Sequence, residues 1–159
     1  MAITAADVNK LRQQTGAGMM DCKNALVEAN GDFETAIDIL RKKGQKIAAK
    51  RGDNEAKEGL IFAQTTADGT AGVILTLNCE TDFVAKNDGY VAMVQSLVDI
   101  ALDKLPATVE ELKALPYDAR LSVEEKITEQ VGVVGEKLDL SGYAVINGNF
   151  VVAYNHPGN

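Results

Sequence analysis

The chain has 159 residues, of which 46% are hydrophobic and 25% are charged, and these fractions are typical of a globular protein with a core of its own. It contains no apolar run of membrane-spanning length and no cationic segment leading into an apolar stretch, so we expect neither insertion nor secretion but a cytoplasmic protein. The two cysteines, Cys22 and Cys79, lack the spacing of a zinc site and are too few for a disulfide framework, so we expect both to be buried apolar residues.

The net charge of −7 is unevenly distributed along the chain. Residues 1–52 carry nine Lys and Arg against six Asp and Glu, a balance of +3, whereas residues 53–159 carry seven against seventeen, a balance of −10. This change predicts a domain boundary near residue 52. The acidic remainder argues against nucleic acid as the main partner, because phosphate binding needs concentrated positive charge.

Three short helices are predicted in the N-terminal region. Thr4 and Asp7 have the spacing of a capping box that opens the first helix, and two glycines end it. The second helix spans about residues 19–29, and Asp32 is the expected cap of the third, which we expect to end at Gly44. Short helices joined by tight turns form a small bundle.

The segment that follows, residues 45–53, is polar and basic, and we interpret it as a partly helical linker. Residues 41–51 could instead form a nucleic-acid patch. No aromatic residue is interleaved there for base stacking, so a solvated tether is the preferred interpretation.

A hairpin and a long helix are predicted next. Residues 60–65 alternate in a strand-like pattern, residues 73–77 form a second strand, and residues 67–70 have the composition of the turn between them. Apolar residues from Tyr90 to Leu105 then recur at helical spacing. This helix should lie across the hairpin and supply the other half of the core.

Two further capping boxes begin at Thr108 and Ser122 and predict a short helix and a longer one. We expect Gly132 and Gly135 to break the longer helix. The tail is predicted to be two more strands, residues 142–146 and 150–154, around the hairpin dipeptide Asn147-Gly148. The sequence ends with His156-Pro157-Gly158-Asn159, residues that are typical of a turn, which suggests that the natural protein continues.

These elements together predict an α+β protein in three parts. A three-helix domain with its basic linker occupies residues 1–52, and the N-terminal half of a core domain, with helices packed on antiparallel strands, occupies residues 53–140. Residues 141–159 would begin a second, truncated core half.

The segment from Asn78 to Asn87, between the hairpin and the long helix, is the best candidate for a functional site. Asp82 and Phe83 stand side by side where the backbone changes from strand to helix periodicity, so both cannot point inward. Phe83 either caps the core or is displayed for binding, and the pattern leaves both alternatives open. Glu80 and Asp82 could also hold a divalent metal or form an acid/base pair, but no third ligand is near in sequence.

The remaining motifs do not indicate an enzyme. The pair Gly16 and Gly18 precedes a helix but lacks the preceding strand and third glycine of a dinucleotide-binding fingerprint. The only histidine, His156, has no Cys or Ser partner in a supporting motif. We therefore expect a protein that acts by binding a partner, without a cofactor or a metal.

Two ordered motifs carry a resemblance to a known family. The first is Leu11-Arg12-x-x-Thr15-Gly16-Ala17-Gly18-Met19-Met20-Asp21-Cys22-Lys23-x-Ala25-Leu26, followed by Asn30-Gly31-Asp32. The second is Cys79-Glu80-Thr81-Asp82-Phe83-Val84-Ala85. Both resemble the signatures of bacterial translation elongation factor Ts, strongly over about the first hundred residues and more loosely from Pro106 onward.

The resemblance implies a guanine-nucleotide exchange factor for elongation factor Tu, which it would bind in the GDP-bound and nucleotide-free states, with neither a nucleic acid nor a membrane as partner. It implies that the N-terminal bundle is similar to a ubiquitin-associated domain. In the family an Asp-Phe pair acts as a wedge, so Asp82 and Phe83 would insert between helices of the GTPase. They would disturb the groups that hold Mg²⁺ and loosen GDP.

The resemblance also implies further partner contacts, at Arg12, Met19, Met20, Lys23, Val131, Gly132 and His156. Of the two methionines, we expect one to be buried in the core. The family continues with strands, helices and a C-terminal module that this chain lacks.

Two other functions remain open at this stage. In the first, the protein is a non-enzymatic adaptor that binds a protein partner through its three-helix domain alone. In the second, it is a metal-dependent enzyme that uses Glu80 and Asp82.

Overall fold

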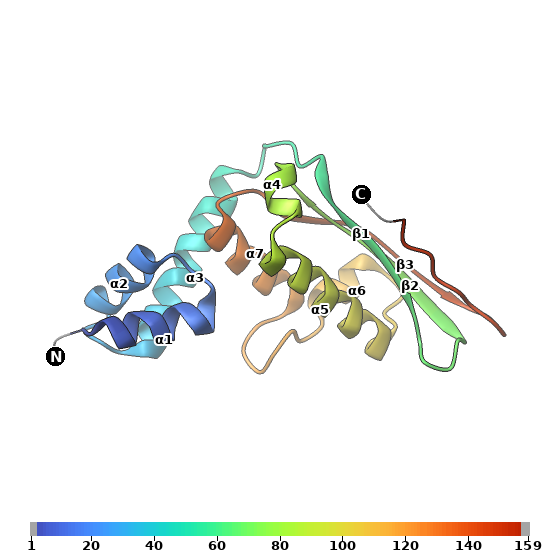
Figure 1. The fold of residues 1–159 in the computed structure, drawn as a ribbon, viewed down its shortest axis with the longest axis horizontal. Helices are drawn as coiled ribbons and strands as arrows, with labels where there is room; N and C mark the ends of the chain where they lie inside the picture. Colours follow the sequence, from blue (N-terminus) through green and yellow to red (C-terminus); the bar gives the residue numbers. More distant parts are fainter. Residues whose placement is uncertain (1–2, 157–159) are drawn as a thin grey trace. The chain divides into compact units, whose positions relative to one another are not determined.

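The structure, a computed structural model, describes residues 3–156 and has the α+β fold that the sequence predicts (Figure 1). The chain divides into two compact units. One comprises the chain up to Asp53 together with Thr128–Glu136, and the other comprises Asn54–Ile127 together with the chain from Lys137 onward. The first unit thus includes residues 128–136, which the sequence analysis assigned to the core domain. Over the described part of the chain, none of the helices combines the length and apolar character that crossing a bilayer requires.

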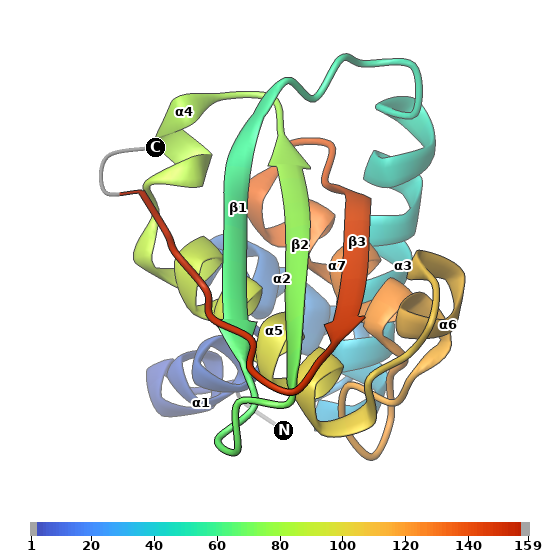
Figure 2. The same ribbon diagram turned by 90° about the vertical axis from the view of Figure 1, so that its right-hand side faces the viewer.

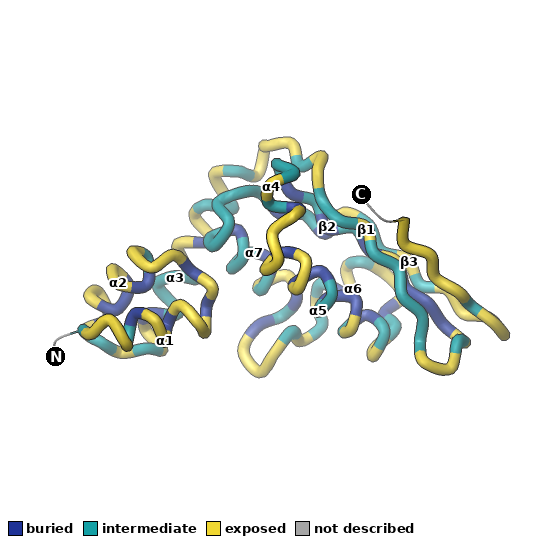
Figure 3. The backbone as a smooth tube through the Cα atoms, in the orientation of Figure 1, coloured by how far each residue is buried: buried dark blue, intermediate teal, exposed yellow. Residues whose placement is uncertain are grey.

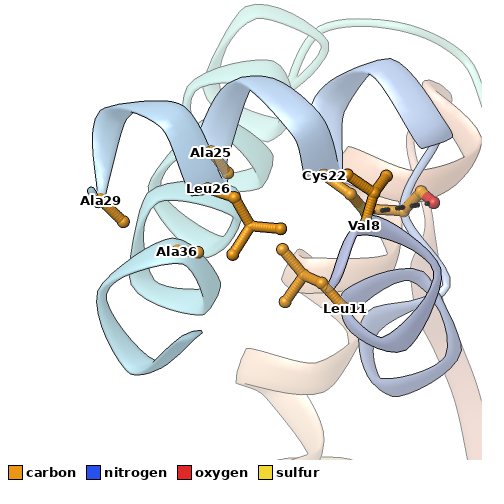
Figure 4. Close-up of a cluster of buried hydrophobic side chains, with 8 residues drawn as sticks. Val8, Leu11, Cys22, Ala25, Leu26, Ala29 and Ala36 are labelled. Atoms are coloured by element: carbon orange, nitrogen blue, oxygen red, sulfur yellow. Dashed lines mark hydrogen bonds between the residues drawn. The ribbon is translucent and has the colours of Figure 1, made fainter. Parts of the chain in front are cut away.

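The N-terminal segment of the first unit forms three helices: α1 (Ala5–Thr15), α2 (Met19–Glu28) and α3 (Phe33–Lys50). Their inner faces enclose a small apolar core (Figure 4), whose buried members are Val8, Leu11, Ala17, Cys22, Ala25, Leu26, Ala29 and Ala36. The outer surfaces of α1 and α2 are exposed (Figure 3). Both cysteines of the chain are buried, as expected.

Side-chain caps begin α1 and α3 where the sequence predicts them. The Asp7 backbone N–H donates to the Thr4 hydroxyl at 3.2 Å, and the Thr4 N–H donates to the Asp7 carboxylate at 3.0 Å, so the capping box is complete. The Asp32 carboxylate accepts from the Thr35 N–H at 2.8 Å. These bonds satisfy donors that the first turn of a helix leaves without a backbone partner.

Two predicted helix ends are wrong, because the glycines concerned serve a close helix crossing. Helix α3 continues through Gly44 to Lys50, and α7 (Val123–Val134) continues through Gly132 and ends before Gly135, whose φ is +75°. A Cβ atom on Gly132 would lie 2.7 Å from the Gly44 Cα, and one on Gly44 would lie 2.9 Å from the carbonyl oxygen of residue 128. Only glycine allows the two backbones to approach this closely.

A three-stranded antiparallel sheet forms the centre of the second unit. Its strands are β1 (Glu58–Thr65), β2 (Ala71–Cys79) and β3 (Asp139–Asn147), with β2 in the middle. The hairpin predicted around residues 67–70 is confirmed, since Glu58 pairs with Cys79 and Thr65 with Gly72. Alternate residues of β2 point to the helical side of the sheet and are buried: Val73, Leu75, Leu77 and Cys79.

Helix α5 (Asp88–Lys104) covers this buried face, as the sequence predicts (Figure 2). Its buried stripe includes Val94, Leu97 and Val98. The predicted short helix is α6 (Val109–Ala114), which begins at its Thr108 cap. The core of this unit therefore lies between the sheet and α5.

The tail differs from the predicted hairpin. Strand β3 pairs with β2, and no strand follows it in the described residues. Instead, the Val151 N–H donates to the Gly69 carbonyl at 2.8 Å, and the Asn155 amide exchanges two hydrogen bonds of 2.8 Å with the Ala63 backbone. Residues 148–156 thus cross the face of the sheet that is turned away from α5 (Figure 2). Their backbone partners lie on the β1–β2 turn and β1, so the Asn147-Gly148 dipeptide does not return the chain along β3.

We predict that Gly132→Ala destabilises the first unit by about 1–3 kcal/mol, because the new methyl group meets backbone that cannot yield without moving a helix. Gly44→Ala should do the same, although alanine favours the helical conformation more than glycine does. The measurement is the thermal unfolding midpoint, Tm, of each variant. Gly52→Ala is the matched control, since its Cβ would lie 3.6 Å from its nearest neighbour. Equal Tm values for all three variants would contradict the close crossing.

Candidate functional site

A single helical turn, α4 (Asp82–Ala85), joins the end of β2 to the start of α5. The Thr81 hydroxyl accepts from the Val84 N–H at 3.4 Å and caps this turn. Directly after it, the Asn87 side chain caps α5 by accepting from the N–H groups of Gly89 at 2.9 Å and of Tyr90. Side-chain caps at both junctions hold a helix that is too short to be stable alone.

Phe83 is displayed on the outer side of this turn. Its side chain is 82% exposed, whereas Val84 is half-buried and Ala85 is buried against the rest of the unit. Helix α4 packs against both β1 and β2, so the inward side of the turn is occupied by its last two residues. The two alternatives for Phe83 are thereby resolved in favour of exposure.

Asp82 forms an ion pair within the same turn. The Lys86 ammonium donates to the Asp82 carboxylate at 2.6 Å. This hydrogen bond and the positive charge of Lys86 lower the pKa of Asp82, and the same interactions raise the pKa of Lys86. Both groups are therefore charged at neutral pH.

The Glu80 carboxylate has a different set of partners. It accepts from the Lys137 N–H at 2.6 Å and from the Asn54 side-chain amide at 3.0 Å. Asn54 and Lys137 are the first residues of the two segments that make up the second unit, so Glu80 holds the start of each segment beside α4. Among residues 3–156 no group of three acidic, Cys or His side chains is placed to hold a metal ion. Glu80 and Asp82 bind separate protein donors, so the geometry does not favour the metal-enzyme hypothesis.

In the first unit, Met19 and Met20 are both exposed, at 57% and 63%. The expectation that one would be buried is wrong, because Cys22 is the first residue of α2 that belongs to the buried core and both methionines precede it. Together with Lys23, the two methionines line a groove of about 550 Å³ between the starts of α1 and α2. Arg12 is exposed on α1.

The other expected contact residues have different environments. Val131 is only 3% exposed. Gly132 packs on Gly44, so the structure gives this glycine a packing role within the first unit. His156 is exposed, and its Nδ1 lies 3.0 Å from the Tyr154 hydroxyl. Contacts of these three residues with a partner stay a prediction.

The structure also shows two site residues to which the sequence analysis gave no role in shaping the site. Lys86 pairs with Asp82, and the i, i+4 spacing that permits this pair is readable from the sequence. The role of Glu80 in holding Asn54 and Lys137 depends on contacts between residues far apart in the chain, and no local pattern indicates it.

Comparisons with known proteins point to one family. The family model described as Elongation factor TS matches residues 80–159. The protein named elongation factor Ts of Christiangramia forsetii is 55% identical over 157 residues, which are 99% of this chain and 56% of the relative. The protein of the same name from Amoebophilus asiaticus is 54% identical over 159 residues, 100% of this chain and 57% of the relative. That of Phocaeicola vulgatus is 51% identical over 159 residues, 100% of this chain and 47% of the relative. The chain spans about half the length of the curated relatives it matches.

We predict that Phe83→Ala changes the free energy of unfolding by no more than about 0.5 kcal/mol, because a mostly exposed ring contributes little to the core. Leu97→Ala, in the buried stripe of α5, should cost about 2–5 kcal/mol. Chemical denaturation of both variants beside the parent chain provides the measurement. A large loss of stability in Phe83→Ala would show that the ring packs inward.

Proposed function

Because the chain belongs to the elongation factor Ts family, we propose that it binds elongation factor Tu and accelerates the release of GDP. The observation that carries this proposal is the display of Phe83, 82% exposed, on a capped helical turn beside the charged Asp82. The action requires protein binding alone, with no covalent step. As a translation factor the protein would act in the cytoplasm.

In this proposal Phe83 is the wedge that enters the GTPase. An exposed benzyl ring is unfavourable in water, and burying it in an apolar pocket recovers roughly 1.5–3 kcal/mol. That free energy becomes available only when the pocket opens between partner helices, so binding favours the distorted form of the GTPase. The Asp82 carboxylate, already charged, would bind a polar group at the rim of that pocket.

Mg²⁺ bridges the nucleotide phosphates to the protein, and the groups around its ligands hold those ligands in place. A wedge that shifts these groups therefore weakens the binding of GDP without touching the nucleotide. Linkage is reciprocal, so a nucleotide that rebinds must lower the affinity of the GTPase for this protein to the same extent. One protein can then act on many GTPase molecules in turn.

The exposed groove of the first unit supports a second contact with the same partner. Met19 and Met20 offer flexible apolar side chains that adapt to a partner surface, and Lys23 adds a charge at the edge. This contact would hold the GTPase in every nucleotide state. This contact supplies affinity for the GTPase, whereas the wedge supplies the difference in affinity between the GDP-bound and nucleotide-free states.

We predict that Phe83→Ala lowers the maximal rate of GDP release at least about tenfold, since a central apolar anchor of an interface contributes roughly 2 kcal/mol or more. The measurement is the release of a fluorescent GDP analogue from elongation factor Tu at fixed Mg²⁺. The matched control is Phe150→Ala, which removes an equally exposed ring elsewhere in the second unit. Equal losses in the two variants, or no acceleration by the parent chain, would contradict the proposal.

We predict a different effect for the double variant Met19→Ala/Met20→Ala. The concentration needed for half-maximal acceleration should rise about tenfold, while the maximal rate stays close to that of the parent, because the contact is the same in both nucleotide states. Val27→Ala, an exposed apolar position on α2 outside the groove, is the control. Binding confined to the first unit, with no change of GDP release by any variant, would instead favour the adaptor function.

A further inference from the structure

We propose that Lys86 is a positioning residue for the wedge: its ammonium holds the Asp82 carboxylate and thereby fixes the turn that presents Phe83. The inference rests on the proposed function, because the wedge is defined by it. It adds a residue outside the Asp-Phe pair that sets how well the pair is presented.

The need for such a residue follows from the length of α4. The helix has four residues, and fixing the first turn of a helix costs more conformational entropy than one backbone hydrogen bond returns. The Lys86 N–H donates to the Asp82 carbonyl at 3.1 Å, and the Lys86 ammonium donates to the Asp82 carboxylate at 2.6 Å. Backbone and side chain thus close the same turn twice, and Phe83 is part of that turn.

A second acidic group favours the charged form of Lys86, which the pair with Asp82 requires. Glu58, the first residue of β1, acts on Lys86 electrostatically in the same direction as Asp82. The charges of both carboxylates favour the protonated form of Lys86, and Asp82 contributes more than Glu58.

The pair is open to solvent, and this sets the size of the expected effect. The Lys86 and Asp82 side chains are 76% and 49% exposed. Exposed ion pairs contribute modestly and weaken as salt screens them. Removing the ammonium should therefore reduce the population of the presented turn without unfolding the unit.

The test compares GDP release from elongation factor Tu with the parent chain and with Lys86→Gln, Lys86→Arg, Asp82→Asn and the double variant Asp82→Asn/Lys86→Gln. At a salt concentration of about 0.05 M, Lys86→Gln should be about two- to threefold slower than the parent, and Lys86→Arg should recover most of the rate because it keeps the charge. At about 0.5 M the difference between the parent and Lys86→Gln should disappear. Lys104→Gln is the control, since it removes a 59% exposed ammonium paired at 2.9 Å with Asp103, at the end of α5 that is farther from α4 along the chain.

Double-variant analysis separates positioning from direct contact with the GTPase. If Lys86 acts through Asp82, Lys86→Gln should cause no further loss in the Asp82→Asn background. Fully additive losses would mean that Lys86 touches the partner itself, and they would overturn the inference. If the parent chain accelerates GDP release and Lys86→Gln accelerates it equally at low salt, the inference about Lys86 is overturned and the proposed function stands. A parent chain that does not accelerate release would overturn the proposed function, and the role of Lys86 with it.

Discussion

The packing of α5 on the buried face of β2 is the constraint on which the candidate site depends. Leu77 near the end of β2 is fully buried, and the Tyr90 hydroxyl at the start of α5 donates to its carbonyl oxygen, so strand and helix are fixed to each other. The residues between them must bridge a set distance with few degrees of freedom. A single capped turn meets that requirement, and it has an inward and an outward side. Ala85 takes the inward side, which leaves Phe83 in solvent.

The residues that build this turn differ from the residue that it displays. Thr81 and Asn87 supply the caps, Glu80 fixes the chain beside them, and none of these bonds involves the Phe83 ring. Stability and display are therefore separable properties of one short segment. An exposed aromatic ring that no fold contact requires is the kind of feature that binding to a partner explains.

Local patterns in the sequence predicted the helices and the hairpin well, because caps and periodicity are properties of neighbouring residues. The capping residues Thr4 and Asp32 begin helices as expected. Gly44 and Gly132 were misread as helix ends, since a glycine that breaks a helix and one that admits another helix look alike without the partner backbone. The prediction of a hairpin in the tail was wrong for the same reason, because it depends on contacts that are distant in the sequence. The Asn155 side chain binds Ala63 on β1, 92 residues away. At the candidate site the residue pattern located Asp82 and Phe83 but left the side of Phe83 open; the family resemblance implied exposure, and the 82% exposure of Phe83 in the structure confirms it.

Phe83 and the groove at Met19 and Met20 suit two different thermodynamic tasks. A contact that is equally favourable in every state of a partner raises affinity but shifts no equilibrium between those states. The groove at Met19 and Met20 is already open in the free chain, and adaptable methionines suit a contact of that uniform kind. A contact that forms only when the partner is distorted shifts the equilibrium by its whole free energy, and a rigidly presented ring such as Phe83 can supply it. In the proposed mechanism rigidity matters, because a turn that could fold back would relieve the strain within this chain instead of within the GTPase. The stiffness of α4 is therefore as much a part of the proposed mechanism as the ring itself.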